Sequence, residues 1–317
     1  MEPNRSRAKR ILTGEMGATR VGISSVGKEP AMPDSVVGLL ISVILPVRNG
    51  MPWLDVQLRA LADQQCEEPW EVVVADNGSN DGSTELAQTW ADRIDGFRVV
   101  DASLVRGAPG ARNSGVRAAK GDLLAFCDAD DAVDKDWLAH CVAALDHADV
   151  VAGVFDFWSL NAGPESPPTA AATHQLGFLP AGLAANIAVR RIAFEEVSGF
   201  AEDLPIGEDI DLCWRLQLRG FRFAIAPEAI VAKRERSTFT EVFRQTAAYG
   251  RCGPVLYRRY RAVGAHRDLV GACKAWVWLA LSIPSLLNDE RRNQWARTAG
   301  VRLGRLAGSV KEGVFFP

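Results

Sequence analysis

The segment between Gly121 and Asp131 constrains the fold of this chain more than any other. Its apolar run, Leu123–Cys127, predicts a buried strand. Three acids follow directly: Asp128, Asp130 and Asp131. Carboxylates gathered at the end of a buried strand repel one another unless a cation neutralises them. A hard divalent metal ion, which prefers oxygen ligands, fits this pattern best, and a metal held there could bind a diphosphate.

Apolar runs alternate with helical periods from residue 39 to residue 155, and this alternation predicts an α/β fold. Because each predicted strand is nearly continuous in apolar residues, we expect a mostly parallel sheet with helices on both faces. Ligands of such sheets bind beyond the carboxyl ends of the strands, so polar clusters at these ends should meet along one edge. The expected strands are 39–47, 70–75, 97–100, 122–127 and 150–155, the expected helices are 53–62, 84–94, 108–119 and 135–145, and the polar clusters are 46–49, 76–83 and 128–131.

The rest of the chain predicts two flanking regions around a central domain, 39–235. Residues 1–38 mix charge, Gly and Pro without a sustained period, which indicates a flexible leader. Beyond Thr240 the pattern is helical throughout, so residues 236–317 are expected to form a basic helical C-terminal region. The chain from Lys233 onward has 16 Lys and Arg against 6 Asp and Glu, although the whole chain has a net charge of −3. Either the two parts have different tasks, or the basic helices face solvent or the acidic domain.

Composition also bears on the compartment and the partners. The six cysteines lack metal-binding spacing, and the basic residues near the start precede no apolar signal segment, so we expect a cytoplasmic protein with free thiols. The apolar stretch 269–287 is interrupted by Lys274 and Pro284, which favours a packed or interface-lying helix over a membrane span. A peripheral membrane contact through the basic C-terminal region is therefore one of the expected possibilities. Nucleic acid is not expected, because no aromatic-interleaved basic motif is present.

Three further segments carry candidate site residues, and each has a structural alternative. Asp76 follows a strand and could accept hydrogen bonds from a nucleobase or ribose, or could simply bond its own turn. Glu208 and Asp209 begin a predicted helix, 207–220, where a carboxylate suits a general base but can equally cap the helix. Arg112 lies in a segment of small residues at a helix start, which could bind an anion or form a plain turn.

Two acids of these segments are expected to have structural partners instead. Asp131 should point toward the helix that follows it, and Asp211 should pair with Arg215. Asp128 and Asp130 are two apart on an extended segment and can address one ligand, although they could also cap the helix near Lys135.

In their order and spacing, these segments together resemble an inverting family 2 glycosyltransferase of the GT-A fold, whose sheet is Rossmann-like. The resemblance covers about residues 40–235. The matching segments are highly specific when taken together, but no single segment is. The matching segments are 43–49, 73–83, 107–121 with Ala111-Arg112-Asn113, 126–131 and 207–209.

The resemblance implies a nucleoside-diphosphate sugar donor, with a UDP-sugar favoured, lying across the strand ends. It places Asp76 at the base and Asp128 near the ribose. Asp130, with Asp128, would hold Mn²⁺ or Mg²⁺ at the diphosphate, where the metal acts as a Lewis acid. The other implied donor-binding residues are Pro46, Val47, Asn49 and Arg112.

The resemblance also implies that Asp209, assisted by Glu208, deprotonates an acceptor hydroxyl of unknown identity. Many relatives carry a His shortly after the last strand, and this chain has none there. Either a basic residue neutralises the diphosphate directly, with Lys233, Arg234 and Arg236 as the candidates, or the metal has fewer protein ligands. We expect the first. Two alternatives stay open: a nucleotidyltransferase that makes nucleotide sugars, and a nucleotide-sugar-binding protein without catalysis.

Overall fold

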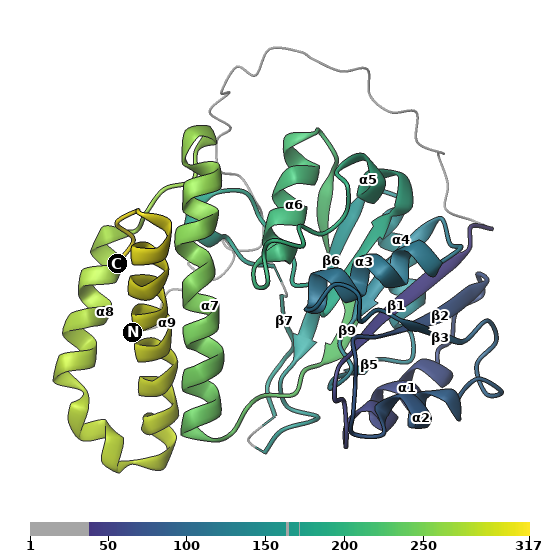
Figure 1. The fold of residues 1–317 in the computed structure, drawn as a ribbon, viewed down its shortest axis with the longest axis horizontal. Helices are drawn as coiled ribbons and strands as arrows, with labels where there is room; N and C mark the ends of the chain where they lie inside the picture. The colour runs from purple at the N-terminus through teal and green to yellow at the C-terminus, as the bar shows by residue number, and fades with distance from the viewer. Residues whose placement is uncertain (1–37, 163–164, 171) are drawn as a thin grey trace, which may run out of the picture. The chain divides into compact units, whose positions relative to one another are not determined.

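The computed structural model describes residues 38–317 except residues 163, 164 and 171, so the predicted leader lies almost wholly outside the described residues. Within them, one mixed sheet has the strand order β3-β2-β1-β4-β8-β6-β9-β5, with β7 paired to β6 (Figure 1). The strands are β1 Ile41–Val47, β2 Trp70–Asp76, β3 Arg98–Asp101, β4 Leu123–Cys127, β5 Ala132–Val133, β6 Val150–Asp156, β7 Thr169–Ala170, β8 Asn186–Arg190 and β9 Phe223–Ala232.

The first half of the sheet is parallel, as the alternation predicts. β3, β2, β1 and β4 all run in one direction, and Val47 at the end of β1 pairs in register with Asp76 at the end of β2. The polar clusters that follow these strands therefore share one edge. β8 is not among the predicted strands, and it runs antiparallel between β4 and β6. The second half of the sheet is mixed, because β7 and β5 also pair antiparallel, with β6 and β9 respectively, whereas β6 and β9 pair parallel. β5, β7 and β9 are likewise not among the predicted strands.

Helices cover both faces of the sheet, and the strand residues alternate between two core clusters. Val43 and Leu45 of β1 pack in the cluster that includes Leu58 of α1 and Trp137 of α4. Ile44, between them in sequence, packs in the opposite cluster, to which α3, α5 and α6 contribute. This alternation follows from the two-residue period of a strand. These helices are α1 Leu54–Ala62, α2 Ser83–Gln88, α3 Ala108–Ala118, α4 Trp137–Leu145, α5 Arg191–Glu196 and α6 Glu208–Leu218, with the short 3₁₀ helix η1 at Gln175–Gly177.

The chain after the sheet is helical, as predicted. Glycines bring α7 and α9 into backbone contact: a Cβ on Gly250 would lie 2.3 Å from the Val301 carbonyl oxygen, and one on Gly304 would lie 2.1 Å from that of Ala247. Leu256 of α7 packs in the same core cluster as α6. No helix among the described residues is long and apolar enough to cross a membrane. The elements are α7 Phe239–Tyr260, η2 Arg261–Val263, α8 Leu269–Leu281, η3 Ile283–Leu287 and α9 Asp289–Glu312.

Candidate active site

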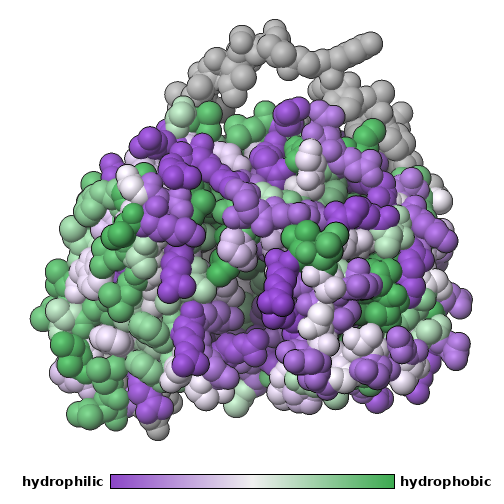
Figure 2. Space-filling model, in the orientation of Figure 1, coloured by the Kyte–Doolittle hydropathy of each residue, from purple (hydrophilic) through white to green (hydrophobic). Residues whose placement is uncertain are grey.

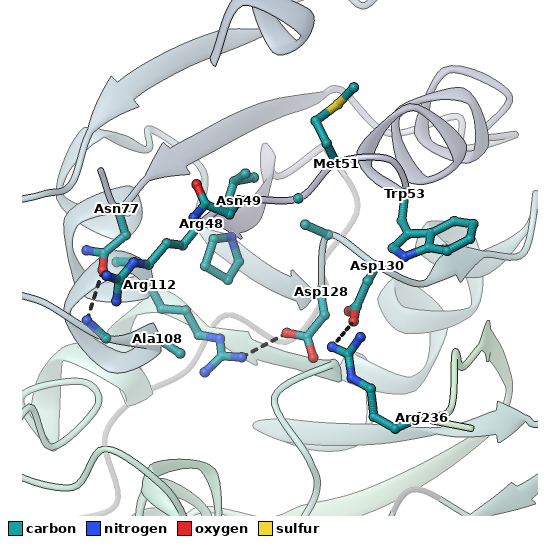
Figure 3. A pocket seen from close by; sticks show the side chains of 16 residues that line it. Arg48, Asn49, Met51, Trp53, Asn77, Ala108, Arg112, Asp128, Asp130 and Arg236 are labelled. Carbon is teal, nitrogen blue, oxygen red and sulfur yellow. Dashed lines mark hydrogen bonds and ion pairs between the residues drawn. The ribbon is translucent and has the colours of Figure 1, made fainter. Parts of the chain in front are cut away.

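A cavity of about 310 Å³ lies at the shared edge of β1, β2 and β4, and we call it the rim cavity (Figure 3). Asp128 and Asp130 come from the end of β4, Arg112 from α3, and Arg236 from the segment after β9. The structure thus brings together most of the residues that the sequence singles out. The predicted residues that line the rim cavity are Pro46, Val47, Asn49, Arg112, Asp128, Asp130 and Arg236.

Asp76 does not line the rim cavity. Its carboxylate oxygens both lie 3.3 Å from the backbone nitrogen of Ser79, so the acid bonds its own turn. The neighbouring Asn77, which the sequence did not single out, does line the cavity. Its Oδ1 accepts a hydrogen bond from the backbone of Gly107 at 2.9 Å, and its Nδ2 donates to the Val105 carbonyl at 2.9 Å. Asn77 therefore fixes the loop that precedes α3.

The loop after β1 is tied to the turn after β2 by four hydrogen bonds, one of them from the backbone nitrogen of Asn49 to Ser79 Oγ at 3.0 Å. The backbone nitrogen of Gly50 donates to Ser83 Oγ at 2.8 Å, and that of Met51 donates to Asp81 Oδ2 at 2.9 Å. Asn49, which has a positive φ of 54°, accepts from the backbone of Asn80 at 2.9 Å. These bonds hold one wall of the rim cavity in place without a ligand.

Arg112 is buried and joins two acids that are far apart in sequence. Its Nη2 lies 2.9 Å from Asp128 Oδ1, and its Nη1 lies 2.6 Å from Glu208 Oε1. Its Nε has no partner in the described structure. Burial alone would raise the pKa of Asp128, but the charges of Lys233 and Arg112 outweigh burial and lower this pKa to about 2. Asp128 is therefore ionised, and its ion pair with Arg112 holds it in the lining of the cavity.

The acidic cluster after β4 has the donor atoms that a hard metal ion requires. One carboxylate oxygen from each of Asp128, Asp130 and Asp131 lies within 4.8 Å of the other two. Each acid also has a cationic partner within the protein: Lys233 Nζ lies 3.1 Å from Asp128 and 2.6 Å from Asp131, and Arg236 Nη2 lies 3.0 Å from Asp130. Asp130 is the acid most open to a metal, because the side chain of its partner Arg236 is exposed and can move away.

Asp131 does not point toward the following helix, and that expectation is wrong. Its fully buried carboxylate binds Lys233 Nζ and accepts a hydrogen bond from the backbone of Arg234 at 3.0 Å. α4 begins without any side-chain cap. The partners of Asp131 come from the chain after β9, about a hundred residues later, so the local pattern could not reveal them.

The three basic residues after β9 have different surroundings. Arg236 lines the rim cavity, and Lys233 lines a second cavity. Arg234 lines neither of these two: its guanidinium carbon lies 3.8 Å from the ring centroid of Trp53, and its Nε donates to the Asp130 carbonyl at 3.1 Å.

The second cavity, of about 420 Å³, opens beside the start of α6, and we call it the α6 cavity. Arg112 and Asp128 line both cavities and so form their common wall. Glu208 and Asp209 of α6 line the α6 cavity, and Tyr249 of α7 lines it as well.

Asp209 is held by two backbone hydrogen bonds, from Ala184 at 3.1 Å and from Ile210 at 2.8 Å. Burial is the main influence on its pKa, which lies above the ordinary value. Burial, with the nearby charge of Asp209, also raises the pKa of Glu208 to about 7 although Arg112 opposes the shift. The two acids thus differ in role: Glu208 is paired to Arg112, whereas Asp209 has no cationic side chain bonded to it among the described residues.

α6 contains one further acid, Asp211, and begins after a glycine, Gly207. Asp211 pairs with Arg215 at 2.7 Å, which confirms the structural role expected for it. Gly207 has a φ of 83°, and a Cβ there would lie 3.1 Å from Cys252 Sγ. Glycine thus permits both the turn into α6 and the close approach of α7.

Sequence analysis missed several residues that line the two cavities. Arg48, Met51 and Trp53 extend the rim cavity beyond the predicted residues, and their position directly after β1 was the available signal. Tyr249 and Cys252 reach the α6 cavity from α7. Nothing in the local pattern of α7 distinguishes them from the other residues of an amphipathic helix.

Comparison with known proteins gives a family match over residues 42–195, to the model described as glycosyl transferase family 2. Glycosyltransferase AglE of Haloferax volcanii is 28% identical over 198 residues, which are 60% of this chain and 65% of AglE. The pre-mycofactocin glycosyltransferase of Mycobacterium tuberculosis is 27% identical over 284 residues, which are 83% of this chain and 57% of that protein. The chain thus spans less than two thirds of the length of either relative.

Among solved structures, the chain is similar to the mannosyltransferase PcManGT of Pyrobaculum calidifontis in complex with GDP-Man and Mn²⁺. The TM-score is 0.60 at 20% sequence identity, and the match covers 87% of this chain and 89% of PcManGT. A likeness at this level of identity shows a shared fold.

Proposed function

Because residues 42–195 match the family model described as glycosyl transferase family 2, we propose that the chain belongs to this family and transfers a sugar from a nucleoside-diphosphate sugar to an acceptor hydroxyl. The observation that carries this proposal is the pair of cavities with a common wall of Arg112 and Asp128. The rim cavity would take the nucleotide and diphosphate. The α6 cavity, which Asp209 lines, would take the acceptor.

The donor is proposed to be a UDP-sugar, bound against the loop after β1. Asn49 and Asn77 would meet the nucleoside, and Arg236 would meet the diphosphate at the open side of the rim cavity. Because Arg236 bonds Asp130 in the structure without a donor, donor binding would exchange one anionic partner of this guanidinium for another. Arg234, which is packed on Trp53, would position the segment and not touch the donor.

Mn²⁺ or Mg²⁺ is proposed as the cofactor, held by Asp130 and Asp128. The close oxygens of the acidic cluster support this proposal, and so does the Mn²⁺ in PcManGT. Such an ion supplies Lewis-acid stabilisation of the leaving diphosphate. Asp131 would keep Lys233 in place beside Asp128 and would not bind the ion, because its carboxylate is fully buried and already paired.

The proposed reaction inverts the anomeric centre. Asp209 takes the proton of the acceptor hydroxyl, whose oxygen attacks the anomeric carbon from the α6 cavity. The bond between that carbon and the diphosphate oxygen breaks on the opposite side. Burial of Asp209 supports this role, because a raised pKa strengthens a carboxylate as a base while its two backbone hydrogen bonds fix its direction. Glu208 would assist by holding Arg112 in the common wall.

The proposed setting is the cytoplasm, because all six cysteines are free and a reducing compartment keeps them so. A nucleotidyltransferase and a binding protein without catalysis are not favoured. The first would need a Gly-rich basic loop after β1, and the second would have no need of Asp209.

A thermal-shift screen with UDP-sugars, GDP-mannose and each free nucleotide, with and without Mn²⁺, tests the donor proposal. A ligand at a hundred times its Kd should stabilise the protein by ~2.7 kcal/mol. Stabilisation by a nucleotide sugar, followed by release of the nucleoside diphosphate in the presence of an acceptor, is expected. A protein that no nucleotide sugar stabilises at millimolar concentration would contradict the proposal.

A further inference from the structure

The outer side of α8 is an apolar surface that no described part of the chain covers. Val270, Val277 and Leu281 follow one another at helical spacing and have exposed fractions of 65%, 58% and 77%. The surface continues into η3, where the exposed fraction of Leu287 reaches 94%. We call these residues, with the exposed Ile283, the α8 face. In Figure 2 hydrophobic side chains gather along the left flank, where Figure 1 places α8.

The helix is apolar on nearly all sides, yet only Ala272 and Leu279 of α8 are buried. A helix of this kind normally lies inside a protein or against a lipid phase. Large exposed apolar surfaces are rare on soluble monomers and mark interaction sites. α8 has 13 residues, and no described helix could cross a membrane, so a lipid contact would be made along the surface and not through it.

The charges around the α8 face identify what would cover it. Lys274 is exposed within the apolar stripe and is the one charged residue in α8 and η3. Arg291 is exposed at the start of α9. The whole region 236–317 carries 14 Lys and Arg against 5 Asp and Glu. Anionic lipid headgroups attract such a basic region, and a Lys within an apolar face can extend its ammonium to the phosphate level.

Trp276 and Trp278 strengthen this inference, because both are partly exposed on α8. Tryptophan side chains favour the boundary between hydrocarbon and water, since the ring is apolar and its N–H is polar.

A second copy of the chain fits the same face poorly. In a two-fold dimer the same patch meets itself, so Lys274 of each copy would enter an apolar interface. α8 and η3 contain no carboxylate to neutralise it there. An unpaired buried ammonium is costly, whereas the headgroup layer of an anionic bilayer supplies phosphate groups.

We propose that the α8 face lies flat in the interfacial layer of an anionic lipid bilayer, with Lys274 and Arg291 directed to the headgroups. The inference concerns surface binding alone, so it does not depend on the transfer reaction or on the identity of the acceptor.

Sedimentation of the full chain with lipid vesicles tests the proposal. We expect binding to vesicles of phosphatidylcholine mixed with phosphatidylglycerol, weaker binding to phosphatidylcholine alone, and a decrease in binding as the salt concentration rises. Val277→Asp with Leu281→Asp should lower the partition coefficient by about tenfold or more, because two side chains lose their apolar contact with the lipid. Leu287→Asp provides an independent variant at a residue that contributes almost nothing to packing.

The matched control replaces two exposed isoleucines away from the face, Ile192 of α5 and Ile225 of β9, by Asp. This control should bind vesicles like the parent chain. Unchanged binding of the Val277→Asp/Leu281→Asp variant, or failure of the parent chain to bind anionic vesicles, would overturn the proposal. Light scattering gives the other decisive result: a parent dimer that the same double substitution converts to a monomer would show that a second copy covers the face.

Discussion

Replacement of Lys233 by Met should destabilise the protein more than any comparable change of a surface lysine. The ammonium lies 2.6 Å from Asp131 Oδ2 and 3.1 Å from Asp128 Oδ2, and the Asp131 carboxylate is fully buried. Met keeps the length and most of the volume of the side chain but removes the charge. Asp131 would then keep one hydrogen bond, from the backbone of Arg234, in a site without access to water.

The expected loss is about 3–5 kcal/mol, the usual effect of breaking a buried ion pair by removing one partner. Domains commonly have only ~5–15 kcal/mol of unfolding free energy, so this loss is readily measured. It should also depend on pH. Burial raises the pKa of Asp131 to about 7 in the folded protein, although Lys233 opposes the shift. A carboxyl group whose pKa is higher in the folded protein than in the unfolded chain stabilises the folded state at pH values below its unfolded pKa. This contribution is lost as the pH rises through the folded pKa. Without Lys233 the loss should therefore be larger at pH 8.5 than at pH 5.5.

Urea unfolding followed by tryptophan fluorescence measures this loss at both pH values. Lys135→Met is the matched control, because Lys135 is exposed and its change should stay within ~0.5 kcal/mol. Lys233→Met combined with Asp131→Asn should recover much of the stability, since the second substitution removes the unpaired charge. A loss below ~1 kcal/mol at pH 8.5, or no recovery in the double variant, would refute the assignment of Lys233 as the partner of a buried charge.

Three further predictions concern the proposed reaction. Asp209→Asn should lower kcat by ~10²–10⁴ with little change in the donor Kd. It should also abolish the acid limb of the pH–rate profile, and in the parent chain this limb should lie above the ordinary Asp range because burial raises the pKa of Asp209. Unchanged turnover would exclude Asp209 as the base. EDTA should weaken binding of the nucleoside diphosphate in calorimetric titrations, and Asp130→Ala should do the same. An affinity that neither EDTA nor the substitution changes would rule out a metal ion in nucleotide binding. Arg236→Ala should raise the donor KM more than Arg234→Ala does, because only Arg236 lines the rim cavity; equal effects would argue against a direct contact.

The fold class could be predicted because its signals are local. Each strand of the parallel half is an apolar run whose residues alternate between two cores, and the GT-A fold expected from the motifs is confirmed. β8 escaped prediction for a tertiary reason. Asn186 at its start looks unsuited to a buried strand, yet its amide is paired with the Trp137 indole and with two backbone carbonyls, of Val154 and Ala229.

The candidate site was predictable where it follows a strand and unpredictable where it depends on a distant partner. Asp130 and Asp131 are adjacent in sequence and chemically identical, but one lines the rim cavity and the other is buried against Lys233. That difference is decided by the chain after β9. Asp76 and Asn77 are a second adjacent pair with different surroundings. Asp76, the predicted site residue, bonds its own turn, whereas Asn77 lines the rim cavity.

The glycine contacts between α7 and α9 affect how this chain could be recombined with its relatives. Tyr249 and Cys252 reach the α6 cavity from α7, and α7 is held against α9 at backbone distance through Gly250 and Gly304. A chimera that exchanged α9 alone would need small residues at matching positions, or α7 would be displaced together with part of the cavity wall. The two helices therefore form one exchangeable unit, and an exchange aimed at the proposed acceptor site should include both.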